Sequence, residues 1–261
     1  MEIDHSKKYY EQSSFWSKNP KGDELKRVNK IISLVPKDVK TILDVGCGNG
    51  VVINRLQNKG FNCTGIDTSK EALKHVKCKR KIMYCNALNF RCNSFNLVIC
   101  AEVLEHLQEG IYENTIKEIE RVSNKYILIT APYKEDLRLK FTKCSNCGTT
   151  YHIYKHIRSF NENCFKKLFT NFKLKRITYI GKVKKQNIVE KYLRYRLGDF
   201  YIDSKTAICP ACNYKNDYKR RYNLFSSIAA LSYRVIPHKI QPHWIVGLFE
   251  NINGCKNNHC L

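Results

Sequence analysis

The sequence has no apolar run near the roughly eighteen residues that a membrane-spanning helix requires. Its first ten residues are polar and charged and contain no apolar stretch of the kind found in secretory signals. Internal repeats and low-complexity segments are also absent. We therefore expect no membrane span, a cytoplasmic location, and one main folded unit within the 261 residues.

Acidic residues are scarce: 23 Asp and Glu face 46 Lys and Arg, which gives a formal net charge of +23. Such an excess suits an anionic partner, such as nucleic acid, a phosphorylated metabolite or a membrane surface. Of the basic residues, 33 are Lys and 13 are Arg. Because lysine is by default a solvated surface residue, the charge alone does not decide between these partners.

Cysteine, in contrast, is abundant, with an odd total of 13. Cys63, Cys85 and Cys100 lie in apolar, strand-like runs and are expected to be small buried side chains. A disulfide framework is not expected in a reducing cytoplasm. Closely spaced cysteine pairs therefore become candidates for metal binding.

Short apolar segments alternate with helical ones from residue 41 to about residue 181, which is typical of a parallel, doubly wound α/β sheet. The expected strands are residues 41–45, 63–66, 82–85, 95–100, 126–130, 174–179 and 244–249. The expected helices are residues 24–35, 51–59, 70–77 and 113–122.

Two segments interrupt this alternation, and each contains one Cys-x-x-Cys pair. We interpret residues 134–158 and 182–241 as insertions into the α/β core. The core itself is then made of residues 41–133, 159–181 and 242–251, and residues 1–40 are expected to form a helical cap.

The segment ILDVGCGNG is the clearest motif, a buried strand that runs into Gly46, Gly48 and Gly50 before a helix. Glycines allow a tight turn and a close approach of the backbone to a ligand, although a purely structural turn is the alternative. Val51 stands where the dinucleotide fingerprint has its third glycine, which disfavours NAD or FAD. Asp44 before the loop suits the cationic end of a ligand better than a pyrophosphate.

Polar residues also follow the next strands. Asp67 in GIDTS could grip a ribose diol as a bidentate acceptor, since Ser69 can cap the following helix. Asn86 in CNA could hydrogen-bond an adenine edge or simply occupy a turn. The run FNLVICAEVLEHL brings three polar side chains to the same edge of the sheet: Glu102, Glu105 and His106.

In this order, the four segments resemble the class I S-adenosylmethionine-dependent methyltransferases, especially small-molecule enzymes of the ubiquinone type, over about residues 40–132. The resemblance implies a Rossmann-like, seven-stranded sheet with strand order 3-2-1-4-5-7-6. It also implies contacts to S-adenosyl-L-methionine from Asp44, Gly46, Cys47, Gly48, Gly50, Asp67, Thr68, Asn86, Ala87 and Ala101. Asn86 departs from the family pattern, in which an acidic residue is common.

Methyl transfer is an in-line displacement, so proximity and orientation supply much of the acceleration. A general base is needed only when the acceptor must lose a proton. His106 is the first candidate, followed by Glu105 and Tyr133, while a substrate-shaping histidine is the alternative. Residues 101–104 read AEVL, unlike the Asn-Pro-Pro-Tyr type of tetrapeptide, which disfavours methylation of adenine amino groups.

The two cysteine pairs have the spacing of zinc knuckles. We expect one Zn²⁺ bound by Cys144, Cys147, Cys209 and Cys212. In the resembled fold both insertions emerge at the ligand-binding edge, so the ion would tie them into a lid over the substrate pocket.

Histidines near the first pair leave alternatives open. His152 and His156 could be zinc ligands, substrate contacts or metal-free residues on a helix face. Three residues of the polar tail are expected to be unligated: Cys255, His259 and Cys260.

The favoured function is methyl transfer to an oxygen, or next a nitrogen, of a small-molecule or carrier-linked metabolite, with the oligomeric state left open. An RNA methyltransferase is the main rival. Residues 182–221 hold eleven basic and four acidic residues, interleaved with Tyr192, Tyr195, Tyr201 and Tyr218. A non-catalytic, zinc-dependent nucleic-acid-binding module is a third reading, against which the intact ligand motifs count.

Overall fold

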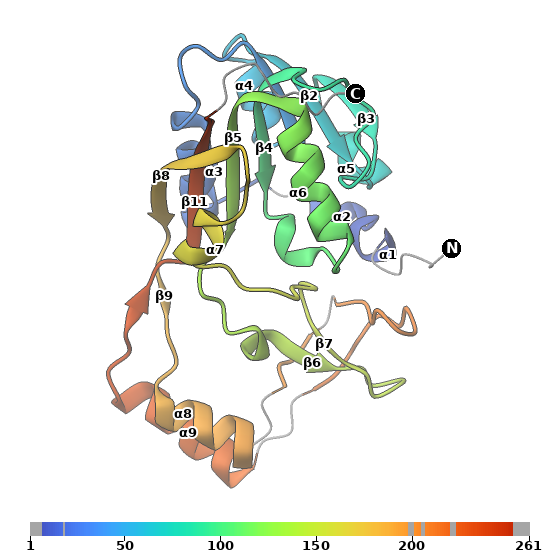
Figure 1. Cartoon of the computed structure of the whole chain (residues 1–261). Coiled ribbons are helices and arrows are strands. Elements are labelled where there is room, and N and C mark those ends of the chain that lie inside the picture. The colour runs from blue at the N-terminus through green and yellow to red at the C-terminus, as the bar shows by residue number, and fades with distance from the viewer. Residues whose placement is uncertain (1–6, 18, 198–200, 205–206, 220–222, 253–261) are drawn as a thin grey trace.

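The computed structural model describes residues 7–17, 19–197, 201–204, 207–219 and 223–252, and a seven-stranded sheet forms its centre (Figure 1). In spatial order the strands are β3 (Lys79–Ile82), β2 (Asn62–Asp67), β1 (Thr41–Val45), β4 (Phe95–Ala101), β5 (Ser123–Pro132), β11 (Trp244–Asn251) and β8 (Phe172–Ile180). The first five are parallel, and β11 runs antiparallel to both of its neighbours. Counted within this sheet alone the order is 3-2-1-4-5-7-6, so the predicted Rossmann-like fold is confirmed.

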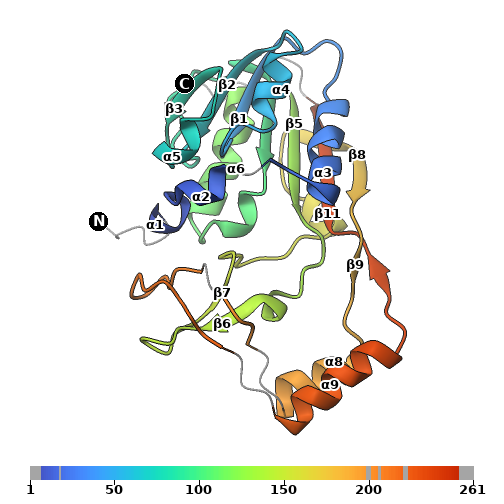
Figure 2. The ribbon, with the colours of Figure 1, turned by 180° about the vertical axis from the view of Figure 1, so that it is seen from behind.

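Helices cover both faces of the sheet (Figures 1 and 2). One apolar core joins α3 (Gly22–Ser33) and α4 (Ile53–Gln57) to the side of β1 that carries Ile42. The other joins α6 (Ile111–Val122) and α7 (Glu162–Lys166) to Leu43 on the opposite side. Successive strand residues point to opposite faces, which is why the buried parallel strands read as continuous apolar runs.

One predicted strand was misplaced, since residues 82–85 were expected and the structure has β3 at Lys79–Ile82. This strand pairs only with β2, and all four of its side chains are exposed. An edge strand with exposed side chains need not be apolar. The prediction followed the apolar residues and therefore placed the strand three residues too late. The helices expected at 51–59 and 70–77 are also shorter, because only α4 and α5 (Lys70–Leu73) are helical there.

The two insertions form a second lobe beyond the carboxyl ends of the strands (Figures 1 and 2). The first contributes η2 (Leu137–Lys140), β6 (Phe141–Lys143) and β7 (Thr150–His152). The second contributes β9 (Val183–Lys184), α8 (Ile188–Tyr192), the π-helical η3 (Leu193–Leu197), α9 (Leu224–Val235) and β10 (Ile240–Gln241). None of the helices in the described ranges is long and apolar enough to cross a bilayer.

The cysteines differ in one respect from expectation. Ten of the described cysteines are free, including those of both Cys-x-x-Cys pairs. Cys92, however, is disulfide-bonded. Cys92 is half-buried in the loop between β3 and β4, whereas the strand cysteines Cys63 and Cys100 are fully buried. The prediction that Cys255, His259 and Cys260 are unligated concerns residues outside the described ranges.

Candidate active site and metal centre

The glycine loop leaves β1 in a tight turn that is tied to the neighbouring strand. The backbone N–H groups of Gly46 and Cys47 both donate to the carbonyl of Ile66 at 2.9 Å. Gly46 and Gly48 have φ values of +71° and +52°, a region that L side chains rarely adopt. A Cβ at Gly46 would also lie 2.3 Å from Cγ2 of Val103, so glycine is required there by packing as well as by conformation.

Asp67 closes this turn from the end of β2. Its carboxylate accepts hydrogen bonds from the N–H of Gly48 at 2.8 Å and from that of Ser69 at 2.9 Å. The Ser69 hydroxyl caps α5, as expected. Asp67 thus accepts two backbone hydrogen bonds, and each of its oxygens keeps a lone pair for a ribose hydroxyl. Thr68 beside it is half-buried.

Asp44 lies fully inside the sheet, one strand away. Burial, followed by the charge of Asp67, raises the pKa of Asp44 to about 8. Arg27 of α3 acts in the opposite direction and is the nearest compensating cation. A cationic ligand group at this position would favour the ionised carboxylate.

Arg27 and Glu102 form a charged pair that was not predicted from the sequence. The Arg27 guanidinium lies 3.9 Å from Glu102 and stacks over the Trp244 ring at 5.2 Å. Its Nε has no hydrogen-bond partner among the described residues. Arg27 lies in a predicted helix and Trp244 starts a predicted strand. Apart from these assignments, nothing in the sequence indicated that the two residues meet at the site.

Glu102 has a strained backbone, with φ at +58°. Its carboxylate accepts hydrogen bonds from Thr130 Oγ1 at 2.9 Å and from Trp244 Nε1 at 2.7 Å, which hold it in place. Ala101 before it is half-buried at the end of β4. Asn86 and Ala87 lie in the turn that follows β3, near the same edge.

Glu105 and His106 lie in η1 (Leu104–His106), directly after β4. Glu105 is fully buried and neither of its carboxylate oxygens has a hydrogen-bond partner among the described residues, so burial raises its pKa far above the usual range. His106 Nε2 lies 4.0 Å from that carboxylate. Burial, and then the neighbouring His156, lower the pKa of His106 to about 3, which keeps the imidazole neutral and makes it a weaker base than a free histidine.

His152 and His156 belong to this site and not to the cysteine pairs. Glu135 lies 2.6 Å from His156 Nδ1 and 3.6 Å from His152 Nε2. Burial would raise the pKa of Glu135, but the bonds to these two histidines prevail and lower it to about 2. The imidazoles stack on each other at 4.6 Å, and the His156 ring lies 4.8 Å from that of His106.

Two of the three alternatives for these histidines do not fit their positions. His152 ends β7 and His156 lies in the turn after it, so neither is on a helix face. β7 pairs with β6, and the chain then bends so that the N–H of His156 donates to Nδ1 of His152. They also form groups with Glu105, His106 and Glu135 that are separate from the cysteines. Their imidazole and carboxylate donors could hold a divalent cation.

Tyr133, the third catalytic candidate, is buried after β5. Its hydroxyl donates to Glu162 at 2.6 Å, and the Tyr179 hydroxyl donates to the same oxygen at 2.7 Å. Lys134 also pairs with Glu162, at 3.2 Å. The Tyr133 hydroxyl is thus engaged by a carboxylate that is not part of the histidine cluster.

The N-terminal segment lies across the same edge of the sheet (Figure 2). Glu11 accepts hydrogen bonds from the N–H groups of Lys70 and Glu71 at the start of α5. The Trp16 ring lies against Gly48, and the Tyr10 ring is 6.0 Å from His106. The segment therefore touches both the glycine loop and the histidine cluster.

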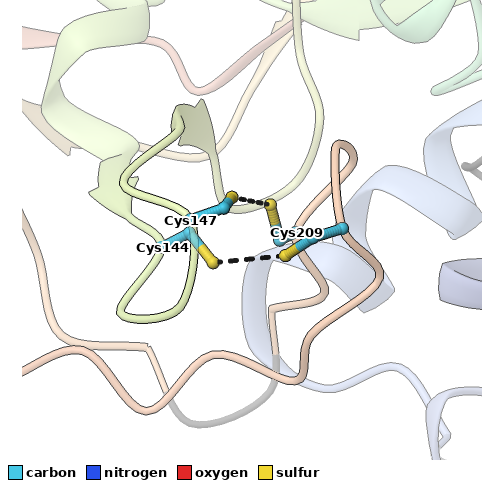
Figure 3. A group of neighbouring side chains, drawn as sticks. Cys144, Cys147 and Cys209 are labelled. Carbon is cyan, nitrogen blue, oxygen red and sulfur yellow. Dashed lines mark hydrogen bonds between the residues drawn. The ribbon is translucent and has the colours of Figure 1, made fainter.

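The four predicted cysteines meet in the second lobe (Figure 3). The Sγ atoms of Cys144 and Cys212 are 3.6 Å apart, as are those of Cys147 and Cys209, and all four lie within 4.8 Å of one another. A tetrahedron with Zn–S bonds of about 2.3 Å has S–S edges of about 3.8 Å. The spacing thus fits a closed tetrahedral site.

The backbone around the cysteines has the same form in both pairs. The N–H of Gly148 donates to the carbonyl of Cys144 at 3.0 Å, and that of Asn213 donates to the carbonyl of Cys209 at 3.0 Å. Both residues have positive φ, at +76° and +57°. The buried Asn216 links the two pairs, since its side chain bonds to the Ser145 N–H at 3.1 Å and to the Lys143 carbonyl at 3.0 Å.

The family described as methyltransferase domain matches residues 43–126, which contain the glycine loop, Asp67 and η1. An uncharacterized protein of Methanocaldococcus jannaschii is 34% identical over 133 residues, or 50% of this chain and 56% of that protein. The ubiquinone biosynthesis O-methyltransferase of Rickettsia bellii is 28% identical over 139 residues, or 44% of this chain and 55% of that enzyme. Residues 43–126 of this chain therefore match the methyltransferase domain family.

The methyltransferase domain also resembles solved structures. Magnesium protoporphyrin IX methyltransferase of Synechocystis with bound SAH has a TM-score of 0.53 at 15% identity and covers 67% of this chain and 91% of its own. A SAM-dependent methyltransferase of Archaeoglobus fulgidus has a TM-score of 0.53 at 14% identity, with 88% and 95% covered. These structures share the fold of this chain. The chain spans about half the length of the curated relatives it matches.

Asp44 should make the stability of the methyltransferase domain depend on pH. The unfolded chain loses this proton near pH 3.9, whereas the folded protein keeps it to about pH 8, so the contribution to the free energy of unfolding falls as pH rises through this window. Asp44→Asn cannot ionise. In urea unfolding, the variant should gain stability relative to the parent between about pH 5 and about pH 8. A difference that does not change with pH would contradict the assignment.

Proposed function

We propose that the chain transfers the methyl group of S-adenosyl-L-methionine to an oxygen, or next a nitrogen, of a small-molecule or carrier-linked metabolite. One juxtaposition supports this most directly. The glycine loop, closed by Asp67, lies at the same sheet edge as the half-buried, neutral His106. A cofactor cradle and a candidate proton acceptor thus share one edge, as methylation of a protonated acceptor requires.

The residues at this edge match the parts of the cofactor. Asp67 would accept the ribose hydroxyls, with Thr68 beside it, and Asn86 and Ala87 would contact adenine. Asp44 and Arg27 would face the amino and carboxylate groups of the methionine end. The backbone of Gly46, Cys47, Gly48, Gly50 and Ala101 would line the pocket between them.

The chain's own contribution to the reaction is orientation and proton transfer. The cofactor supplies an electrophilic methyl group bonded to a sulfonium. The acceptor atom would form a bond to that carbon as the C–S bond breaks, the electron pair of that bond would return to sulfur, and the acceptor proton would pass to His106. Glu105, the second candidate, is disfavoured as the base because burial raises its pKa and keeps it protonated. Glu135 would orient His156, and through it the His106 ring. Tyr133 remains a third candidate.

The second lobe would act as a lid over the acceptor, with residues 134–158 and 182–241 tied together by Zn²⁺. The short S–S distances support this role for Cys144, Cys147, Cys209 and Cys212. The ion would be structural, since a closed set of four thiolates offers no open position for chemistry.

An RNA methyltransferase remains the second candidate because of the basic second insertion. The tyrosines of that insertion weaken the case. Tyr195 stacks with Arg138 at 4.3 Å and Tyr201 packs against Tyr218 at 6.0 Å, so these rings contact protein groups, and Tyr192 alone of the four is largely exposed.

Asp67→Ala should weaken binding of S-adenosyl-L-methionine by about 1.5 to 3 kcal/mol, because a charged hydrogen-bond acceptor is lost. Isothermal titration calorimetry measures this. Asp38→Ala removes an exposed carboxylate that pairs with Lys125 and is the matched control, with unchanged affinity. Thermal melts check that the glycine loop, which Asp67 also holds, has not unfolded. Equal affinity in both variants would place the cofactor elsewhere.

In a turnover assay, the protein should form S-adenosylhomocysteine when a small hydroxyl or amino compound from a panel of acceptors is added. Adding RNA in place of the small compound should give no S-adenosylhomocysteine. His106→Gln should slow turnover by about 10²-fold to 10⁴-fold, the usual contribution of a general base, with cofactor affinity retained. Turnover with RNA alone would favour the rival function. Turnover unaffected by the substitution would exclude His106 as the base.

Purified protein should contain one zinc per chain, measured by elemental analysis. The double variant Cys209→Ser and Cys212→Ser should release it, because half of a tetrahedral site binds weakly. Cofactor affinity should persist, since the proposed cofactor contacts include none of these cysteines. Cys164→Ser, a half-buried cysteine outside the cluster, should keep the zinc. A metal-free parent protein would contradict the proposed site.

A further inference from the structure

The helices at the far end of the second lobe are built with their apolar sides outward. The residues of α9 that are buried are small, Ser226 and Ala229. Its large apolar residues are exposed, with 71% exposure for Leu224, 59% for Leu231 and 71% for Val235. Together with Ile228 these residues are spaced four, three and four apart, so they form one face of the helix.

The neighbouring helix α8 repeats this arrangement. Its buried residue is Glu190, which pairs with Arg194 at 3.6 Å, whereas Ile188 is 83% exposed. Val189 and Tyr192 are exposed as well. The two helices pack side by side at the end of the lobe away from the sheet (Figures 1 and 2). Exposed apolar residues gathered on two neighbouring helices in this way mark an interaction site.

Cations surround this apolar surface. Residues 182–197 and 223–241 contain eight basic residues, and Glu190 is their single acidic residue. Lys184, Lys185, Arg234 and Lys239 are exposed. A groove of about 490 Å³ also opens at the end of α9, lined by Lys184, Arg234 and His238 together with the apolar Val235, Pro237 and Ile240.

We infer that α8 and α9 dock the protein on the surface of an anionic lipid bilayer. The exposed apolar face would enter the headgroup and acyl boundary, as amphipathic helices do, while the cations contact lipid phosphates. The groove would admit a single headgroup. Twelve residues of α9 are too few to span the membrane, so the helix would lie in its plane. A second copy fits less well, because pairing two such surfaces would bring the exposed Lys184, Lys185, Arg234 and Lys239 of each chain together.

Flotation of the full chain with vesicles tests this inference. The parent should bind vesicles of phosphatidylcholine with phosphatidylglycerol, bind pure phosphatidylcholine far less, and lose binding as salt increases. Leu224→Ser with Leu231→Ser should lower the partition coefficient by about tenfold or more, because apolar area no longer enters the lipid. Ile82→Ser with Ile252→Ser, exposed apolar residues on the sheet domain, should leave it unchanged.

A second pair on the same surface, Ile188→Ser with Val235→Ser, should repeat the loss if the first variant folds poorly by circular dichroism. Equal binding to both kinds of vesicle, or none to either, would overturn the inference. So would a dimeric parent that both variants convert to a monomer in light scattering, since the surface would then be covered by a second copy.

Discussion

The parallel pairing of β2, β1, β4 and β5 is the constraint on which the rest of the molecule depends. It brings the carboxyl ends of four strands to one edge, where strand registry sets which groups meet. Val45 pairs with Ile66, so the glycine loop reaches the Ile66 carbonyl and Asp67 reaches Gly48. Ala101 pairs with Thr130, which places the Thr130 hydroxyl against the strained Glu102. A shift of one residue would separate both pairs.

The same edge concentrates ionisable groups that are poorly compensated. Asp44 and Glu105 are buried carboxyls with a raised pKa, and His106 is a half-buried imidazole with a lowered one. Each is therefore held neutral by desolvation, at a cost to folding that the apolar cores on both faces of the sheet must offset. Groups kept in their neutral forms respond strongly to a charged ligand, which is the physical reason that such clusters mark functional sites.

Features that depend on neighbouring residues could be predicted from the sequence. Contacts between distant segments could be predicted only where the residue types suit a common ligand, as the cysteines do. The glycine loop and Asp67 followed from apolar runs and the residues that end them, the strand order from the resemblance to the class I methyltransferases, and the four cysteines from their spacing. Arg27 and Glu135 gave no such signal, because a charged residue in a helix or after a strand is usually solvated. β3 was misplaced since its edge position relaxes the apolar pattern, and Cys92 gave no sign of its disulfide.

The antiparallel pair β8 and β11 explains how one chain can build two lobes. Because these strands run in opposite directions, the segment between them leaves and returns at one edge of the sheet, where β9 and β10 continue as a two-stranded ribbon. The chain after β5 emerges at that same edge, so the cysteines of both insertions can meet although they lie more than sixty positions apart. The four thiols lie within 4.8 Å of one another at this meeting point, whereas α8 and α9 lie beyond it with large apolar residues exposed. The one antiparallel strand pair thus accounts both for the clustered cysteines and for the helices at the far end of the second lobe.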